Sequence, residues 1–192
     1  MPEKGQQLLP ARELLTYEEL LRIIYISAQL GITKFRITGG EPLIRKDIIQ
    51  FMEEAVKVAR AARRNTGMAA DNIEFAITTN GVLLSDYATN IFDSGIKRVN
   101  ISLDTLDRKR FKKISHSNIK LQQIIDGIKS AINVGFELIK LNVVVMKRFN
   151  TDEFDRFIEF ALENKVVVRF IEQMPFGNNR SNEFFSLKEV EQ

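Results

Sequence analysis

Residues 34–59, KFRITGGEPLIRKDIIQFMEEAVKVA, contain the pattern that decides the fold. KFRIT (34–38) predicts a short strand that ends at Gly39 and Gly40, because glycine commonly bounds an extended segment. From residue 48 onward the apolar side chains recur at helical spacing, which predicts a helix over 48–64. The stretch is therefore a strand, a turn and a helix in succession.

The same order recurs along the rest of the chain. Further strands are predicted at 73–78, 97–102, 137–146 and 166–172, and further helices at 85–94, 121–134 and 151–164. Thr16 and Glu19 form a capping-box pattern that predicts a helix ahead of the first strand, and Thr151 is the predicted cap of the last helix. This alternation indicates an α/β fold with a parallel sheet. Because the series begins with a helix, a first strand is missing from the pattern.

Composition favours one soluble globular domain over 1–192, since 44% of the residues are hydrophobic and 28% are charged. No apolar run is long enough to span a membrane, and the first residues lack the layout of a signal peptide. The net charge of +3 suits an anionic substrate, but a bias this small is usually a solvated surface. Cysteine is absent, so these residues build no disulfide, zinc–thiolate or iron–sulfur site by themselves.

Small, hydroxyl and amide side chains follow several predicted strands. The strand ends are TGGEP (38–42), TTNG (78–81), SLD (102–104), MK (146–147) and EQMP (172–175). Ligands bind at the carboxyl ends of the strands in parallel α/β folds, so these segments predict a shared pocket. Paired glycines expose N–H donors to a carboxylate or phosphate, although GGEP alone is a weak signal. No Ser/His/Asp or Cys/His set is present, so no catalytic acid–base residue and no metal ligand is predicted.

Five phrases, in order, resemble the radical S-adenosylmethionine (SAM) enzymes, in the form found in the GTP 3′,8-cyclases that begin molybdenum cofactor synthesis. They are RITGGEPLIRKD (36–47), TTNG (78–81), RVNISLDTLD (98–107), KLNVVVMK (140–147) and VRFIEQMPFGNN (168–179). GGEP by itself indicates the superfamily, and the ordered set indicates the cyclases. The resemblance covers nearly the whole chain and implies a (β/α)6 partial TIM barrel, incomplete here because its first strand is missing.

The resemblance assigns two groups of binding residues. The positions that match SAM contacts are Gly39, Gly40, Glu41, Ser102 and Met174, with Glu41 as the acceptor for the amino group of SAM. The positions that match GTP contacts are Arg36, Thr78 and Lys140. Guanidinium and ammonium groups suit an anionic triphosphate.

These residues also have plainer interpretations. Arg36 and Lys140 could form surface ion pairs, and Met174 could fill the core. Thr78 and Ser102 could be ordinary hydroxyls at strand ends. Strand alternation favours the functional interpretation of Arg36, because it places Phe35 and Ile37 on one face and Arg36 with Thr38 on the other.

The chemistry that the resemblance implies belongs largely to cofactors. In the family a four-iron cluster cleaves SAM, the 5′-deoxyadenosyl radical takes hydrogen from the GTP ribose, and the ribose carbon attacks guanine to give 3′,8-cyclo-7,8-dihydro-GTP. The full-length family holds two [4Fe-4S] clusters, while the protein positions two nucleotides and excludes water. The resemblance implies a cytoplasmic lyase, or a mitochondrial matrix one in a eukaryote, that forms a homodimer and has no nucleic-acid or membrane partner.

The resemblance breaks at both ends of the chain. The family's first strand leads to a C-x3-C-x2-C loop, which many members follow with MPE-x-G, a short spacer and LLT. This chain begins MPEKGQQLLPARELLT, and it ends before the family's three later cysteines. We therefore expect a core fragment that is truncated at both ends, holds no cluster and is inactive. Without the first strand, 34–38 becomes an unpaired edge, which favours self-association.

Residues 60–72, RAARRNTGMAADN, read as a surface insertion relative to the family pattern. Arg60, Arg63 and Arg64 resemble a basic nucleic-acid patch, but at a helix C-terminus they are expected to complement the helix dipole instead.

Three other functions remain open at this point. The chain could be a degenerate, cysteine-free paralogue that only binds nucleotides, which native ends to the gene would support. It could be another radical SAM enzyme, such as a peptide maturase, which a lack of GTP binding would support. An ordinary phosphate-binding α/β enzyme ranks last, because it would use a glycine-rich loop that leads into a helix, whereas Pro42 and an apolar pair follow GGE here.

Overall fold

The computed structural model of the chain describes residues 13–115, 118–174 and 184–189. Its centre is a five-stranded parallel sheet in the order β1-β2-β3-β4-β5. The strands are β1 (Lys34–Ile37), β2 (Glu74–Thr79), β3 (Arg98–Ser102), β4 (Leu138–Val145) and β5 (Val167–Glu172). Each strand pairs with the next in chain order, and right-handed crossovers in such a sheet return the connecting helices to the same face. The sheet is open at β1 and β5, which confirms the predicted α/β partial barrel.

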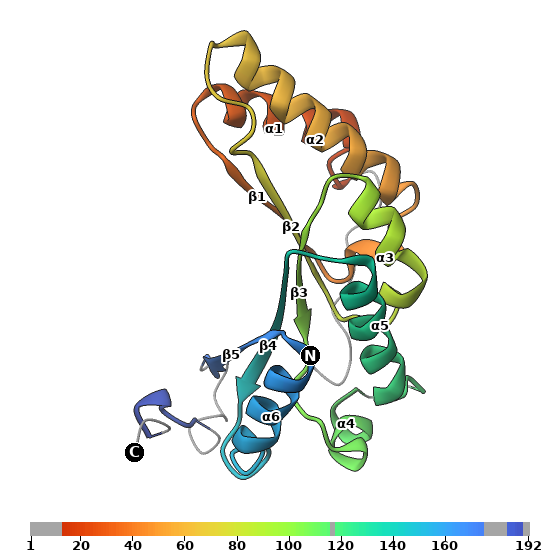
Figure 1. Cartoon of the computed structure of the whole chain (residues 1–192), viewed down its shortest axis with the longest axis vertical. Helices are drawn as coiled ribbons and strands as arrows, with labels where there is room; N and C mark the ends of the chain where they lie inside the picture. Colours follow the sequence, from red (N-terminus) through yellow and green to blue (C-terminus); the bar gives the residue numbers. More distant parts are fainter. Residues whose placement is uncertain (1–12, 116–117, 175–183, 190–192) are drawn as a thin grey trace.

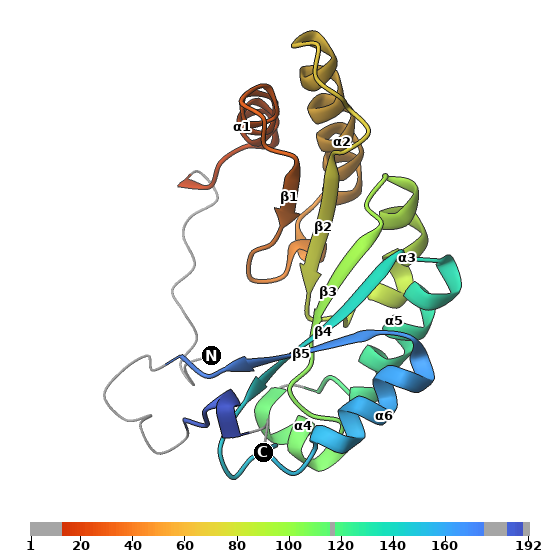
Figure 2. The ribbon, with the colours of Figure 1, turned by 60° about the vertical axis from the view of Figure 1, so that its left-hand side comes forward.

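Six α-helices accompany the described strands. They are α1 (Tyr17–Gln29), α2 (Ile48–Asn65), α3 (Leu84–Asp93), α4 (Arg108–Ser115), α5 (Leu121–Val134) and α6 (Phe154–Asn164), with two short 3-10 turns, η2 (Pro42–Ile44) and η3 (Leu187–Glu189). Figure 1 and Figure 2 show α2, α3, α5 and α6 covering one face of the sheet and α4 at the carboxyl ends of the strands. In the described part of the chain no helix is long and apolar enough to cross a membrane.

The predicted strands and helices are confirmed, with most ends within one residue. The capping box of α1 is present: the Glu19 N–H donates to Thr16 Oγ1 at 3.3 Å, and the Thr16 N–H donates to Glu19 Oε2 at 2.8 Å. The alternation in β4 sets which side chains face the helices: Ile139 and Leu141 are buried under them, while Lys140 between them faces the other way. The apolar pattern therefore indicated where the five strands and the helices packed on them lie.

One local prediction was wrong, and one helix was not predicted. Thr151 does not cap the last helix, which begins at Phe154 after Glu153; Thr151 lies in the preceding turn. The short helix α4 was not predicted, because RKRFKKIS has too few apolar residues to show a helical stripe. Its signal was Asp107, whose Oδ1 accepts hydrogen bonds from the N–H groups of Lys109 at 2.9 Å and Arg110 at 2.8 Å.

The segment 60–72 contains the last turn of α2 and the loop that follows it. Arg63 and Arg64 lie in that last turn, as predicted, but Arg63 is buried. Its Nε donates to the Ala69 carbonyl at 3.0 Å, and its Nη1 lies 3.0 Å from Met68 Sδ. Arg63 therefore holds the loop against α2, which is a structural role that the dipole argument missed.

Strand register arranges the helix-free face in transverse rows. One row, from β1 to β4, is Arg36, Ala76, Arg98 and Leu138. The next is Thr78, Asn100, Lys140 and Val167, and the one nearest the strand ends is Ser102, Asn142 and Arg169. Because register aligns these residues, polar side chains that are far apart in the sequence share one surface.

Candidate nucleotide-binding site

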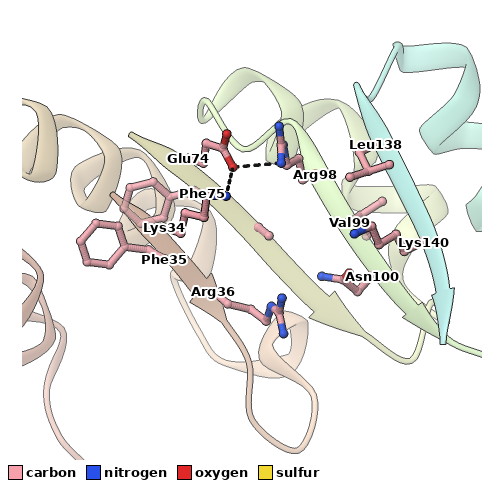
Figure 3. Close-up of a pocket in the computed structure, with 11 residues that line it drawn as sticks. Lys34, Phe35, Arg36, Glu74, Phe75, Arg98, Val99, Asn100, Leu138 and Lys140 are labelled. Atoms are coloured by element: carbon pink, nitrogen blue, oxygen red, sulfur yellow. Dashed lines mark ion pairs between the residues drawn. The ribbon is translucent and has the colours of Figure 1, made fainter. Parts of the chain in front are cut away.

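A cavity of about 340 Å³ lies over the starts of the strands on the helix-free face. Figure 3 shows its lining, which we call the basic cavity: Lys34, Phe35, Arg36, Glu74, Phe75, Ala76, Arg98, Val99, Asn100, Leu138 and Lys140. In Figure 3 the side chains of Arg36 and Asn100 point toward each other across β2. Four cationic side chains thus face this cavity with one carboxylate.

The single carboxylate neutralises only part of that charge. Glu74 Oε2 lies 2.9 Å from Arg98 Nη1 and 4.0 Å from Lys34 Nζ. Arg36 and Lys140 have no ion pair within the described residues. Their uncompensated charges make this face attractive to an anion.

A second cavity, of about 430 Å³, lies at the carboxyl ends of β1, β2 and β3. We call it the strand-end cavity, and its lining is Gly39, Gly40, Thr78, Thr79, Asn80, Val82, Ser102, Leu103, Asp104, Phe111, Ile114, Ser115, Ile119 and Ile124. Its volume falls within the range of roughly 300–1,000 Å³ that is typical of small-molecule sites. A larger cavity of about 650 Å³ between α4 and the start of α5 contains none of the predicted site residues.

The structure divides the predicted residues between the two cavities. Of the SAM group, Gly39, Gly40 and Ser102 line the strand-end cavity. Of the GTP group, Arg36 and Lys140 line the basic cavity. Thr78, which was predicted to contact GTP, lines the strand-end cavity and sits beside Asn100 of the basic cavity in the strand register. The two cavities therefore follow each other along β2 and β3, the first over the strand starts and the second at the strand ends.

Glycines form one wall of the strand-end cavity. Both Gly39 and Gly40 are exposed, and a Cβ added at either would meet no protein atom within 4 Å. The protein itself thus leaves room at these positions, and their backbone groups are open to a ligand.

Glu41 and Met174 line neither cavity. Met174 is 65% exposed after the end of β5. The Glu41 carboxylate joins two turns instead: Oε1 accepts from Thr79 Oγ1 at 2.8 Å and the Leu43 N–H at 3.1 Å, and Oε2 accepts from the Asn80 N–H at 2.6 Å. The predicted contact between Glu41 and the amino group of SAM stays a prediction. In the structure the Glu41 carboxylate already accepts hydrogen bonds from three protein donors.

Thr79 completes that junction; the sequence placed it in the TTNG segment of the predicted pocket but did not predict this role. Its side chain is 2% exposed, and its Oγ1 also accepts the Gly81 N–H at 3.0 Å. The available signal was its place as the last residue of β2, where alternation turns it toward the helices and away from Thr78. Thr79 therefore positions the two glycine turns that border the strand-end cavity.

A buried network supports the opposite wall, between β3 and α4. Glu153 is 1% exposed and accepts hydrogen bonds from Thr105 Oγ1 at 2.6 Å, the Leu106 N–H at 2.8 Å and Arg110 Nη1 at 2.8 Å. Arg110 also pairs with Asp152 at 2.6 Å, which lowers the pKa of the Asp152 carboxyl. The charged hydrogen bonds of Glu153 and Arg110 hold the segment between β3 and α4, so this segment presents a rigid surface to the cavity.

Comparison with known proteins identifies the class. The profile of the Radical SAM superfamily matches residues 4–161, so the chain belongs to that superfamily. The chain is 43% identical over its whole length to a GTP 3′,8-cyclase of Thermodesulfovibrio yellowstonii, of which it covers 57%. It is 42% identical over 92% of its length to the Peptoclostridium acidaminophilum GTP 3′,8-cyclase, of which it covers 50%. The chain thus spans about half the length of the curated relatives that it matches.

Solved structures confirm the fold. Native anSMEcpe with bound AdoMet superposes with a TM-score of 0.64 at 17% identity, over 90% of this chain and 48% of that one. Coproporphyrinogen III oxidase from Escherichia coli superposes with a TM-score of 0.51 at 13% identity, over 82% of this chain and 37% of that one. At these identities the likeness establishes the shared barrel architecture alone.

The superfamily uses SAM together with a [4Fe-4S] cluster, and the two groups fit this chain differently. The strand-end cavity offers open glycine backbone, hydroxyl groups, a carboxylate and apolar walls, which suit a charged nucleoside such as SAM. The 192 residues contain no cysteine, so they supply no thiolate for a cluster. No group of three or more His, Cys, Asp or Glu in the described residues is arranged to hold a metal ion.

Proposed function

We propose that the chain is the nucleotide-binding core of a GTP 3′,8-cyclase, with SAM in the strand-end cavity and GTP in the basic cavity. The observation that carries the proposal is the placement of two cavities of different charge one after the other along the same strands, β1, β2 and β3. Two substrates that must react with each other need adjacent sites, because proximity supplies much of the rate enhancement in such reactions.

The chemistry of each lining supports this assignment. A triphosphate is polyanionic, and Arg36 and Lys140 offer it a bidentate guanidinium and an ammonium that no described carboxylate neutralises. SAM carries a sulfonium, an ammonium and an adenosyl group, for which the strand-end cavity offers Asp104, hydroxyl groups and the apolar side chains of Phe111 and Ile119. The curated relatives at 43% and 42% identity are named GTP 3′,8-cyclases, which supports GTP over other triphosphates.

The whole protein's proposed activity is the SAM-dependent cyclisation of GTP. These 192 residues alone bind both nucleotides without turnover, because they contain no cysteine to hold the cluster. A paralogue that only binds nucleotides would show the same binding, so the proposal for this chain concerns the two sites.

Isothermal titration of the chain with SAM, GTP, guanosine and inorganic triphosphate tests the proposal. We expect one site for SAM and one for GTP, with inorganic triphosphate competing for the GTP site. Guanosine should bind at least about 100-fold more weakly than GTP, since it lacks the charges that Arg36 and Lys140 would pair. Failure of both SAM and GTP to bind would contradict the proposal, and SAM binding without GTP binding would favour a different radical SAM enzyme.

A further inference from the structure

The strand-end cavity contains a single ionisable side chain among its described lining residues, the carboxyl group of Asp104. No lysine, arginine or histidine contributes to that lining, whereas the basic cavity has four cations. Asp104 has no ion pair within the described residues, and burial raises the pKa of its carboxyl group. A partly buried carboxylate that forms no ion pair with any described residue keeps unused capacity for a cation, which points to a partner that arrives with the ligand.

Asp104 is held firmly in this position. Its Oδ1 accepts the Val144 N–H at 2.8 Å, taking the place of a strand carbonyl just beyond the end of β3. Its carbonyl oxygen accepts from Asn150 Nδ2 at 2.7 Å, and Asn150 is 3% exposed and also donates to the Val144 carbonyl at 2.9 Å. The next residue, Thr105, is anchored on buried Glu153 at 2.6 Å. The carboxylate is thus preorganised rather than free to turn away from the cavity.

Glu41 is the other acidic residue near the glycine turns, and its situation differs. Its two oxygens already accept three protein hydrogen bonds, from Leu43, Thr79 and Asn80, and it does not line the cavity. Within residues 13–115, 118–174 and 184–189, a single hydrogen bond, from the Val144 N–H, reaches the Asp104 carboxylate. Of the two carboxylates, Asp104 has the greater unused capacity for a cation.

We infer that Asp104 receives the positively charged methionyl end of SAM, through its ammonium or sulfonium group, and so selects cationic SAM over neutral adenosine derivatives. This inference rests on the proposed binding of SAM in the strand-end cavity. It assigns to Asp104 the electrostatic part of recognition and leaves the adenosyl group to the hydroxyl and apolar lining. Pairing a preformed, partly desolvated carboxylate with a cation gives a strong charge-assisted interaction.

The test compares SAM with 5′-methylthioadenosine, which has the same adenosine and a neutral thioether but no amino-acid end. Asp104→Asn keeps an oxygen that can accept the Val144 N–H and removes only the charge. We expect the variant to weaken SAM binding at least about tenfold in calorimetric titration while changing 5′-methylthioadenosine binding less than about twofold. Asp71→Asn, at an exposed loop position with no partner among the described residues, makes the same charge change and should alter neither affinity.

The outcomes separate this inference from the proposed function. An equal loss for both ligands would assign Asp104 to the ribose and overturn the inference, and unchanged SAM binding in a folded Asp104→Asn variant would also overturn it. In both cases the unsubstituted chain still binds SAM, so the proposed function stands. A lack of SAM binding by the unsubstituted chain would contradict the proposed function and this inference together. A thermal melt of each variant establishes that it is folded.

Discussion

The two cavities differ in charge although both are lined by residues of β1, β2 and β3 or of the turns that follow these strands. The basic cavity over the strand starts has four cationic side chains and one carboxylate, and the strand-end cavity has no cation and one carboxylate among its described lining residues. Successive positions on the same face of β3 therefore line different cavities: Arg98 and Asn100 line the basic cavity, and Ser102 lines the strand-end cavity. The difference shows that one β-strand can contribute to two sites of different charge, since its side chains on one face repeat every two residues and reach a different cavity at each end of the strand.

Removing the free cations of the basic cavity should have the largest effect. Arg36→Ala with Lys140→Ala should weaken GTP binding about 100-fold, roughly 3 kcal/mol, because two charge-assisted contacts to phosphate are lost, allowing for their partial exposure. SAM affinity should stay within about threefold. Arg60→Ala with Arg64→Ala removes the same charge from exposed positions near the end of α2 and serves as the control for calorimetric titration. A matching loss in that control would mean that net charge, and not the cavity, attracts GTP.

Breaking the junction of the two glycine turns should have the next largest effect. Thr79→Val removes the hydroxyl that donates to Glu41 and accepts the Gly81 N–H, so it leaves buried polar groups without partners. We expect a loss of about 1–3 kcal/mol in the free energy of unfolding, measured by denaturant titration, and weaker SAM binding. Thr79→Ser keeps the hydroxyl and should restore SAM affinity, and a failure to do so would show that packing by the methyl group, not the junction, is what matters.

The charge of Asp104 should reduce stability in the absence of ligand. Burial raises the pKa of this carboxyl in the folded chain, so the folded state binds the proton more tightly than the unfolded state. The stability that protonation provides is complete below the unfolded pKa and is lost as the pH rises through the folded value. Asp104→Asn should therefore raise the melting temperature at pH 7 and lose this advantage toward pH 3. An equal gain at both pH values would show that charge is not the cause.

Releasing the paired cations of the basic cavity should have the smallest effect. Glu74→Gln removes the carboxylate that pairs with Arg98 and Lys34 at the cavity wall. These pairs are partly exposed, and such pairs contribute about 0–1 kcal/mol, so GTP affinity should rise by no more than about fivefold. Glu54→Gln on the exposed side of α2 is the control for the change in net charge. A fall in GTP affinity would mean that Glu74 orients Arg98 for the ligand.

The apolar pattern predicted the sheet and its helices because an element that buries one face has apolar residues at regular intervals in its sequence. The pattern predicted a helix over 121–134 that ends before Gly135, and the structure shows α5 with these bounds. Gly135 ends the helix because it adopts a positive φ of 93°, which glycine tolerates. The pattern missed α4, whose residues are almost all charged and none of which is buried. A short surface helix is fixed by its cap at Asp107, which a search for apolar stripes does not detect.

The candidate site was predicted in part. The other residues come to the site through strand pairing and long-range contacts, which the sequence does not show. Gly39, Gly40 and Ser102 were identifiable because they follow strands, where ligands bind in parallel folds. Asp104 and Thr79 lie in strand-end segments that predicted the pocket, but their individual roles were not predicted, because these depend on contacts with Val144 and Glu41, which are 40 and 38 residues away in the chain. No local pattern records such a contact, so only the assembled sheet shows which polar residue faces which cavity.

The most direct test of the account is a titration of GTP into the chain that has been saturated with SAM. If the two cavities are separate sites for the two nucleotides, GTP binds with a stoichiometry of one and a Kd within about threefold of its value without SAM. If SAM raises the apparent Kd of GTP in proportion to its concentration, the two ligands compete for one site. That result would contradict the assignment of the two cavities to different nucleotides.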